Sequence, residues 1–176
     1  MRWIIEKAIA DEIVPAIAWA KSFLSTFDLQ RLNWLRIDTG RGRYTGAYGR
    51  CWYPASGKGY RISIQVPGPF PYRQTRFVTP LYRNESGKWP EIPPNHEAAG
   101  FGMDSRSGRE WMRLTTEYEM RDRSEAVVHI AAHEFFHFLR HSRQIPGRNT
   151  EIEADRFAIK RIAEFRLQIS GGTTAV

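Results

Sequence analysis

The stretch His133-Glu134-Phe135-Phe136-His137 sets two imidazoles and one carboxylate at a spacing that metal chemistry can use. In a helix, successive residues turn by about 100° and rise by about 1.5 Å, so side chains four residues apart project from one face roughly 6 Å apart. Two histidines at this spacing can bind one metal ion, and zinc suits imidazole. Glu134 then lies beside the ion, where a carboxylate can accept a proton from water. The stretch therefore predicts a metal-binding helix with its own general base.

The residues before this stretch predict the helix independently. Asp122 with Glu125 three residues later is typical of a capping box, and residues 126–132 contain neither Gly nor Pro. Apolar residues surround the histidine face, which indicates a buried helix in which His and Glu need polar partners. The alternative is a chance match to the pattern.

Four histidines follow one another at intervals of four residues: His129, His133, His137 and His141. Three in succession cannot share one ion, because the first and third lie about 12 Å apart along a helix. Only His133 and His137 bracket Glu134, so these two are the predicted ligands. We expect His129 to be a buried helix histidine, and His141 to lie at the rim of the cleft or to cap the helix end.

A second helix is predicted to deliver the third ligand. Pro146-Gly147 is a turn signal, and Thr150 with Glu153 three residues later forms a second capping box, so a helix is expected over residues 150–168. Its predicted core-facing stripe consists of Glu151, Asp155, Ile159 and Ile162.

The two acids on this stripe have different predicted roles. Glu151 would be the third metal ligand, while Asp155, one turn later, would accept the far ring N–H of a ligand histidine and set its tautomer. Glu153 is used at the helix start and is expected to be solvated. An acidic first turn favoured by the helix dipole is the alternative explanation for Glu151.

These residues resemble the gluzincin metallopeptidases, in which H-E-x-x-H is followed on a second helix by E-x-x-A-D, here E-I-E-A-D at 151–155. The chain is similar to the small SprT-like and ImmA/IrrE-like families and to the catalytic core of membrane-bound Ste-type peptidases. The resemblance covers residues 122–163. It implies that His133, His137 and Glu151 hold zinc, that Glu134 is the general base, and that Asp155 contacts a ligand histidine and not the ion. It also implies a peptide or protein substrate.

Length and composition favour one cytoplasmic domain over residues 1–176. The single cysteine, Cys51, excludes an intramolecular disulfide and fits a reducing compartment. No run approaches the roughly 20 apolar residues of a membrane span, so no membrane association is expected.

The net charge of +7 is concentrated in residues 36–76, which contain eight basic residues and one acidic residue. Aromatic residues are interleaved with these basic residues, as in surfaces that stack bases and meet phosphates, so nucleic acid is a possible partner of this segment. The alternative is a sheet whose aromatic residues face the core and whose arginines face water.

The expected fold class is α+β: a zincin-like minimal metalloprotease domain with an N-terminal helix, a small, curved, mostly antiparallel sheet, the H-E-x-x-H helix and a C-terminal helix. We predict the first helix at 3–24 and strands at 31–38, 43–53, 60–66, 76–82 and 111–119, with irregular chain in much of 67–108. The last strand is expected at a sheet edge, where it could pair with an extended peptide. Tyr118 on this strand and His96 before it are candidates to stabilise the transition state.

The function predicted from the sequence is that of a zinc-dependent endopeptidase, and the resemblance to SprT-like proteases implies action on DNA-associated proteins. Two alternatives stay open: a nucleic-acid-binding protein with a structural or non-catalytic metal and histidine cluster, and a repressor-cleaving peptidase of the ImmA type. A His₂-Glu site also accepts cobalt, nickel or manganese.

Overall fold

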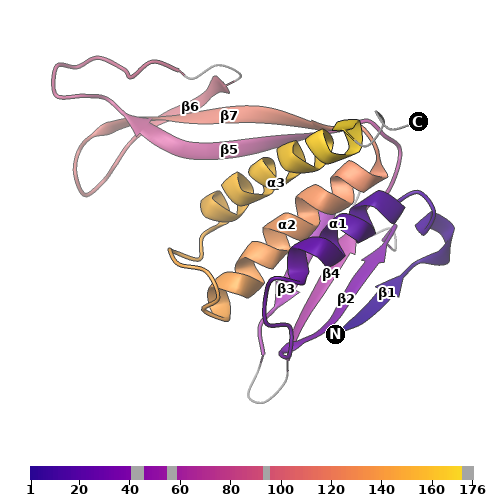
Figure 1. Cartoon of the computed structure of the whole chain (residues 1–176). Coiled ribbons are helices and arrows are strands. Elements are labelled where there is room, and N and C mark those ends of the chain that lie inside the picture. Colours follow the sequence, from indigo (N-terminus) through magenta and orange to yellow (C-terminus); the bar gives the residue numbers. More distant parts are fainter. Residues whose placement is uncertain (41–45, 55–58, 93–95, 172–176) are drawn as a thin grey trace. The chain divides into compact units, whose positions relative to one another are not determined.

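The computed structural model describes residues 1–40, 46–54, 59–92 and 96–171. The chain is α+β and divides into two compact units, one formed by residues 1–70 with 121–176 and the other by residues 71–120. The single domain that the sequence predicts over residues 1–176 stays a prediction. Figure 1 labels the elements of both units.

The first unit contains a four-stranded mixed sheet in the order β1 (Arg2–Ile5), β2 (Leu32–Asp38), β4 (Tyr60–Gln65) and β3 (Tyr48–Trp52). β1 and β4 run parallel to β2, and β3 runs antiparallel to β4. Ile62 and Ile64 alternate with exposed or half-buried residues and are fully buried, as the period of two predicts. This sheet is therefore mixed, which corrects the expected mostly antiparallel sheet, and only the β3–β4 pair matches that expectation.

The N-terminal segment corrects the predicted helix at 3–24. β1 comes first, a 3₁₀ turn (Lys7–Ile9) follows, and the helix α1 covers only Val14–Leu24. Pro15 lies in its first turn, where proline fits because that N–H needs no helical partner. Trp3 and Ile5 pair in register with Leu35 and Ile37 of β2. β1 connects through α1 to β2, which is why these two neighbouring strands can run parallel.

Helix α2 (Arg123–His141) begins as the capping box predicts. The Asp122 side chain accepts a hydrogen bond from the Glu125 backbone N–H at 2.8 Å. Every residue from 124 to 139 is buried, which confirms the expected buried helix. The Glu125 carboxylate accepts hydrogen bonds from Arg121 and from Arg166 of α3 and so links the two helices.

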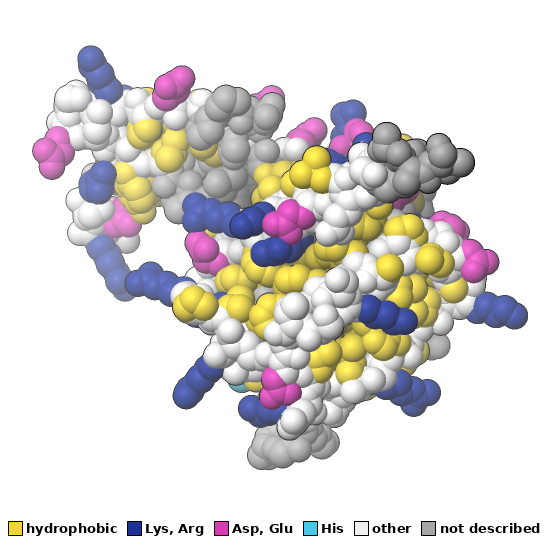
Figure 2. All heavy atoms as spheres, viewed as in Figure 1, with side chains coloured by type: hydrophobic (Ala, Val, Ile, Leu, Met, Phe, Trp, Pro, Cys, Tyr) yellow, Lys and Arg dark blue, Asp and Glu magenta, His cyan; other side chains and the backbone are white. Residues whose placement is uncertain are grey.

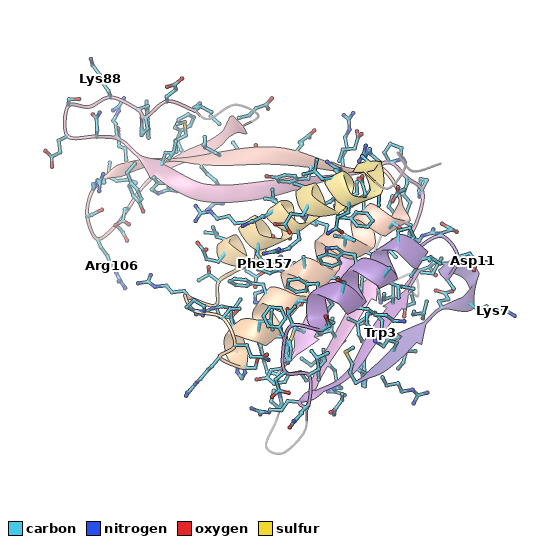
Figure 3. All side chains as sticks on the ribbon, in the orientation of Figure 1. Trp3, Lys7, Asp11, Lys88, Arg106 and Phe157 are labelled. Carbon is cyan, nitrogen blue, oxygen red and sulfur yellow. The ribbon has the colours of Figure 1, made fainter. Side chains whose placement is uncertain are left out.

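Helix α3 (Glu151–Gly171) packs along α2, and Figure 1 shows α1, α2 and α3 side by side. Phe157 of α3, labelled in Figure 3, meets Phe23 of α1 edge-on and Phe136 of α2. The buried stripe of α3 consists of Ala154, Ala158, Ile162 and Phe165. The buried stripe is thus offset from the predicted stripe by about one residue around the helix. This offset leaves Glu151 at the exposed margin of α3 and Asp155 half-buried.

The second unit is an antiparallel sheet of three strands in the order β5 (Tyr72–Tyr82), β7 (Glu110–Met120) and β6 (His96–Met103). The strands predicted at 76–82 and 111–119 are confirmed, but β6 lies within the stretch expected to be irregular. Because β6 pairs with β7, the latter is the central strand of its sheet. The prediction that it is an edge strand open to a peptide is therefore wrong.

None of the helices in the described residues is both long and apolar enough to cross a membrane.

Candidate metal centre

The two histidines of the H-E-x-x-H stretch point their Nε2 atoms at each other. His133 and His137 are both 7% exposed and lie one turn apart on α2. Their Nε2 atoms are 3.1 Å apart. Two ring nitrogens that are both unprotonated would repel each other at this distance, whereas a shared cation would be bound by both lone pairs.

The carboxylate of Glu151 closes this pair into a cluster of three. Its Oε2 lies 3.1 Å from Nε2 of His133, and its Oε1 lies 3.4 Å from Nε2 of His137. A tetrahedral zinc site with bonds of about 2.0 to 2.1 Å has ligand atoms about 3.3 Å apart. The three side chains could therefore hold one zinc-sized ion with little rearrangement.

Glu151 reaches the histidines because it is the first residue of α3. In the connection between α2 and α3, Arg140 donates a hydrogen bond to the backbone carbonyl of Ile145. Gly147 in the same connection adopts a φ of 114°, a conformation that favours glycine. The Glu151 side chain is 78% exposed, whereas the histidine side chains are 9% exposed. One side of the cluster thus faces solvent, which a catalytic metal site needs for its open position.

Each histidine ring is oriented by an acceptor on its far nitrogen. Nδ1 of His133 lies 2.9 Å from Oδ1 of Asp155, and Nδ1 of His137 lies 2.9 Å from Oδ1 of Asn149. Both acceptor oxygens require a proton on Nδ1, because neither can donate. This tautomer leaves the Nε2 lone pairs directed at the cluster, as metal ligands require. The contact predicted for Asp155 is therefore present, and Asn149 supplies a second contact of the same kind.

Glu134 is 6% exposed and lies on α2 between the histidines, against β3. Burial raises the pKa of its carboxyl group, while His133 and His137 act to lower it; Glu151 adds to the rise, and the backbone N–H of Cys51 donates to the carboxylate. A raised pKa suits a carboxylate that accepts a proton and then releases it.

Gly49 lets β3 approach this carboxylate closely. A Cβ at residue 49 would lie 2.5 Å from Oε1 of Glu134 and 2.5 Å from Cγ2 of Ile130, far closer than van der Waals contact. Any larger residue would therefore displace β3 or Glu134.

Sequence reasoning missed Asn149 and Tyr53. Nδ2 of Asn149 donates to the Tyr53 hydroxyl at 3.1 Å, which connects the end of β3 to the ring of His137. Burial raises the pKa of Tyr53, and the nearby charges of Glu134 and Glu151 contribute to the rise. Asn149 precedes the Thr150 cap and could have been noted as a polar residue beside Glu151, but no local pattern indicates Tyr53.

The two remaining histidines of α2 lie outside the cluster. His129 is buried, with 1% of its surface exposed. His141, the last residue of α2, is exposed, lies with Nδ1 2.6 Å from the Tyr60 hydroxyl and stacks on Tyr53 with ring centres 4.4 Å apart. His141 is thus joined to the metal cluster only indirectly, through Tyr53 and Asn149.

Tyr118 and His96 belong to the second unit, where they lie on the paired strands β7 and β6. Their role in the transition state stays a prediction.

No family model, curated protein or solved structure matches the chain. The chemistry assigned to this site therefore rests on its residues: His133, His137 and Glu151 form a candidate His₂-Glu metal centre with the buried Glu134 on the same helix.

Proposed function

We propose that the chain is a zinc-dependent endopeptidase with a zincin-like catalytic core of the gluzincin type. The observation that carries this proposal is the convergence of three ligand atoms within 4.8 Å of one another, two from α2 and one from α3, beside a buried carboxylate of raised pKa on α2. A purely structural zinc site has four protein ligands, whereas three ligands and an exposed side are typical of catalytic sites.

The donor set favours zinc, since two imidazoles and a carboxylate are ligands that this ion accepts in hydrolytic enzymes. When bound, zinc would supply a water molecule of lowered pKa and a Lewis acid for the substrate carbonyl. His133, His137 and Glu151 would hold the ion, and Asp155 and Asn149 would keep both rings in the ligating tautomer.

Glu134 is the proposed general base. Its carboxylate takes a proton from the attacking water as the oxygen adds to the peptide carbonyl carbon, and returns that proton to the amide nitrogen as the C–N bond breaks. The buried position fits this exchange, because a raised carboxyl pKa brings the acid and base forms closer in energy near neutral pH.

β3 is the element best suited to bind an extended peptide. It is the terminal strand of its sheet in the described residues, so one edge has backbone groups available for another strand. Gly49 and Cys51 on this strand lie against Glu134. A peptide added to this edge would therefore pass beside the general base.

The test compares Glu134→Gln with His137→Ala for zinc content and for cleavage of a quenched fluorescent peptide library. Glu134→Gln should keep its zinc and lose cleavage by about 10²- to 10⁴-fold, and His137→Ala should lose both. Glu164→Gln, which alters a carboxylate paired with Arg161 on α3, is the matched control and should retain both. Unchanged cleavage by Glu134→Gln would refute the assigned base.

A further inference from the structure

The face of the β1–β4 sheet opposite α2 carries arginine and tryptophan in alternation across the strands. The inward residues of β2 and β4, including Leu35 and Ile62, are buried, so their neighbours in the sequence face outward. Register places Arg2 beside Trp34, Trp34 beside Arg61, and Arg61 beside Trp52. We call this surface the open face; its residues are Arg2, Ile4, Trp34, Arg36, Asp38, Tyr48, Arg50, Trp52, Arg61, Ser63 and Gln65.

The guanidinium groups of this face lie against the indole rings. Arg61 lies 6.0 Å from the ring centre of Trp34 and 5.8 Å from that of Trp52, and Arg50 lies 5.3 Å from the Trp52 ring. The two indoles are themselves 5.8 Å apart, centre to centre. This is one continuous aromatic and cationic layer across three strands.

The charge of the open face is strongly unbalanced. It holds four arginines and one acid, Asp38, whose carboxylate pairs with Arg36 at 2.5 Å. Arg2, Arg50 and Arg61 are exposed, and none of them forms an ion pair within the part of the chain that the structure describes. Figure 2 views the molecule from the helix side, where basic, acidic and apolar side chains are interspersed.

The topology of the sheet indicates that this face has a partner. All-parallel sheets are normally covered on both faces, and two of the three strand pairs in this mixed sheet are parallel. In the first unit, α1 and α2 lie together on the inner face (Figure 1), so neither covers the two half-buried tryptophans outside.

We infer that the open face binds single-stranded nucleic acid, with bases stacked on Trp34 and Trp52 and phosphates bound by Arg2, Arg50 and Arg61. Neighbouring strands are about 4.8 Å apart, so the row from Arg2 to Trp52 is about 14 Å wide and offers alternating stacking and phosphate positions. A duplex would match the charge but leave the indoles unused, because its bases are already stacked on one another.

The structure shows which basic residues of the segment predicted at 36–76 belong to the open face. Of the five basic residues of this segment that the structure describes, Arg36, Arg50 and Arg61 lie on the open face, together with Arg2 from outside the segment. Arg73 and Arg76 belong to the second unit, and Arg41, Arg43 and Lys58 lie outside the described residues.

The experiment measures fluorescence anisotropy of a labelled oligothymidylate of about 15 nucleotides with the full chain over a range of salt concentrations. Arg50→Ala/Arg61→Ala should weaken binding and reduce the slope of log K against log salt by about 1.4, or 0.7 for each lost phosphate contact. Trp34→Leu/Trp52→Leu should weaken binding at least about fivefold with little change in that slope.

The matched control is Arg106→Ala/Arg156→Ala, which removes the same charge elsewhere. Arg106, labelled in Figure 3, is exposed at the turn between β6 and β7, and Arg156 pairs with Glu153 on α3. It should bind the oligonucleotide as the parent does. Trp34→Phe/Trp52→Phe, which keeps the rings, should restore most of the affinity lost in the leucine variants if those variants are correctly folded.

Three outcomes would overturn the inference: no measurable binding by the parent at low salt, equal loss in the matched control, or unchanged binding in both open-face variants. Binding that depends on the arginines but not on the tryptophans, together with equal affinity for duplex DNA or for phosphatidylserine vesicles, would also overturn it. Such a result would show a non-specific anionic partner instead.

Discussion

Removing the Asp155 carboxylate should weaken zinc binding more than removing the Asn149 amide. Both accept from a ligand histidine at 2.9 Å, but Asp155 is charged and its side chain is only 16% exposed, whereas Asn149 is exposed. Loss of such a partner costs about 10- to 100-fold in metal affinity, or about 1.4 to 2.8 kcal/mol. A charge-assisted bond is about twice as strong as a neutral one, so Asn149→Ala should cost about half that free energy.

Competition with a chromophoric chelator measures these affinities directly. Asp155→Ala and Asn149→Ala are compared with Glu153→Ala, which removes a carboxylate of α3 that pairs with Arg156 and touches neither histidine. Thermal unfolding in excess chelator separates lost metal affinity from lost stability. Zinc affinity unchanged in Asp155→Ala, or reduced equally in Glu153→Ala, would refute the role assigned to Asp155.

Three further predictions concern Glu134, Gly49 and Glu125. The carboxyl group of Glu134 in the metal-free chain should titrate above pH 4.5, because burial raises its pKa; an NMR titration that places it at or below pH 4.5 would contradict this. Gly49→Ala should lower the free energy of unfolding, measured in urea, by about 1 to 3 kcal/mol. Gly100→Ala is the control and should lower it less, because a Cβ there meets nothing within 4 Å. Equal losses in the two variants would contradict close packing at residue 49. Burial acts to raise the pKa of Glu125, but hydrogen bonds from Arg166 and Arg121 outweigh burial and lower this pKa from 4.5 to about 2. The ionised carboxylate therefore contributes about 3 kcal/mol to the free energy of unfolding. That contribution is present above pH 4.5 and is lost as the pH falls towards 2. Glu125→Gln should therefore be less stable than the parent at pH 7 and approach it at pH 2, and a constant difference would contradict the assignment.

The two C-terminal helices could be predicted because their start signals are local. The side chains of Asp122 and Thr150 accept hydrogen bonds from backbone N–H groups three positions later, as N-cap residues do, so each helix begins within one residue of its predicted start. The predicted metal ligands come together for the same reason, since Glu151 immediately follows a cap and two histidines one turn apart share a face.

The elements missed by the sequence depend on partners far along the chain. Residues 2–5 form a strand only because β2, about 30 residues later, pairs with them in register. β6 is rich in Ala and Gly, which have low strand propensity, and it is held by its pairing with β7. Local patterns cannot show either pairing.

The same limit applies at the metal centre. Tyr53 meets Asn149 across 96 positions of the sequence, and Gly49 is required by the approach of β3 to Glu134. The helical period correctly placed Ile162 in the core but put Glu151 on the inward stripe, whereas it lies at the exposed margin of α3 and turns its carboxylate back to the histidines.

Elemental analysis of the purified chain at controlled free zinc tests the central claim most directly, with Glu151→Ala and Glu153→Ala measured beside it. The proposed centre predicts about one zinc per chain in the parent and in Glu153→Ala, and loss of that zinc in Glu151→Ala. A parent chain that binds no zinc when it is supplied, or a Glu151→Ala variant that retains zinc with unchanged affinity, would contradict the His133, His137 and Glu151 site and with it the proposed peptidase.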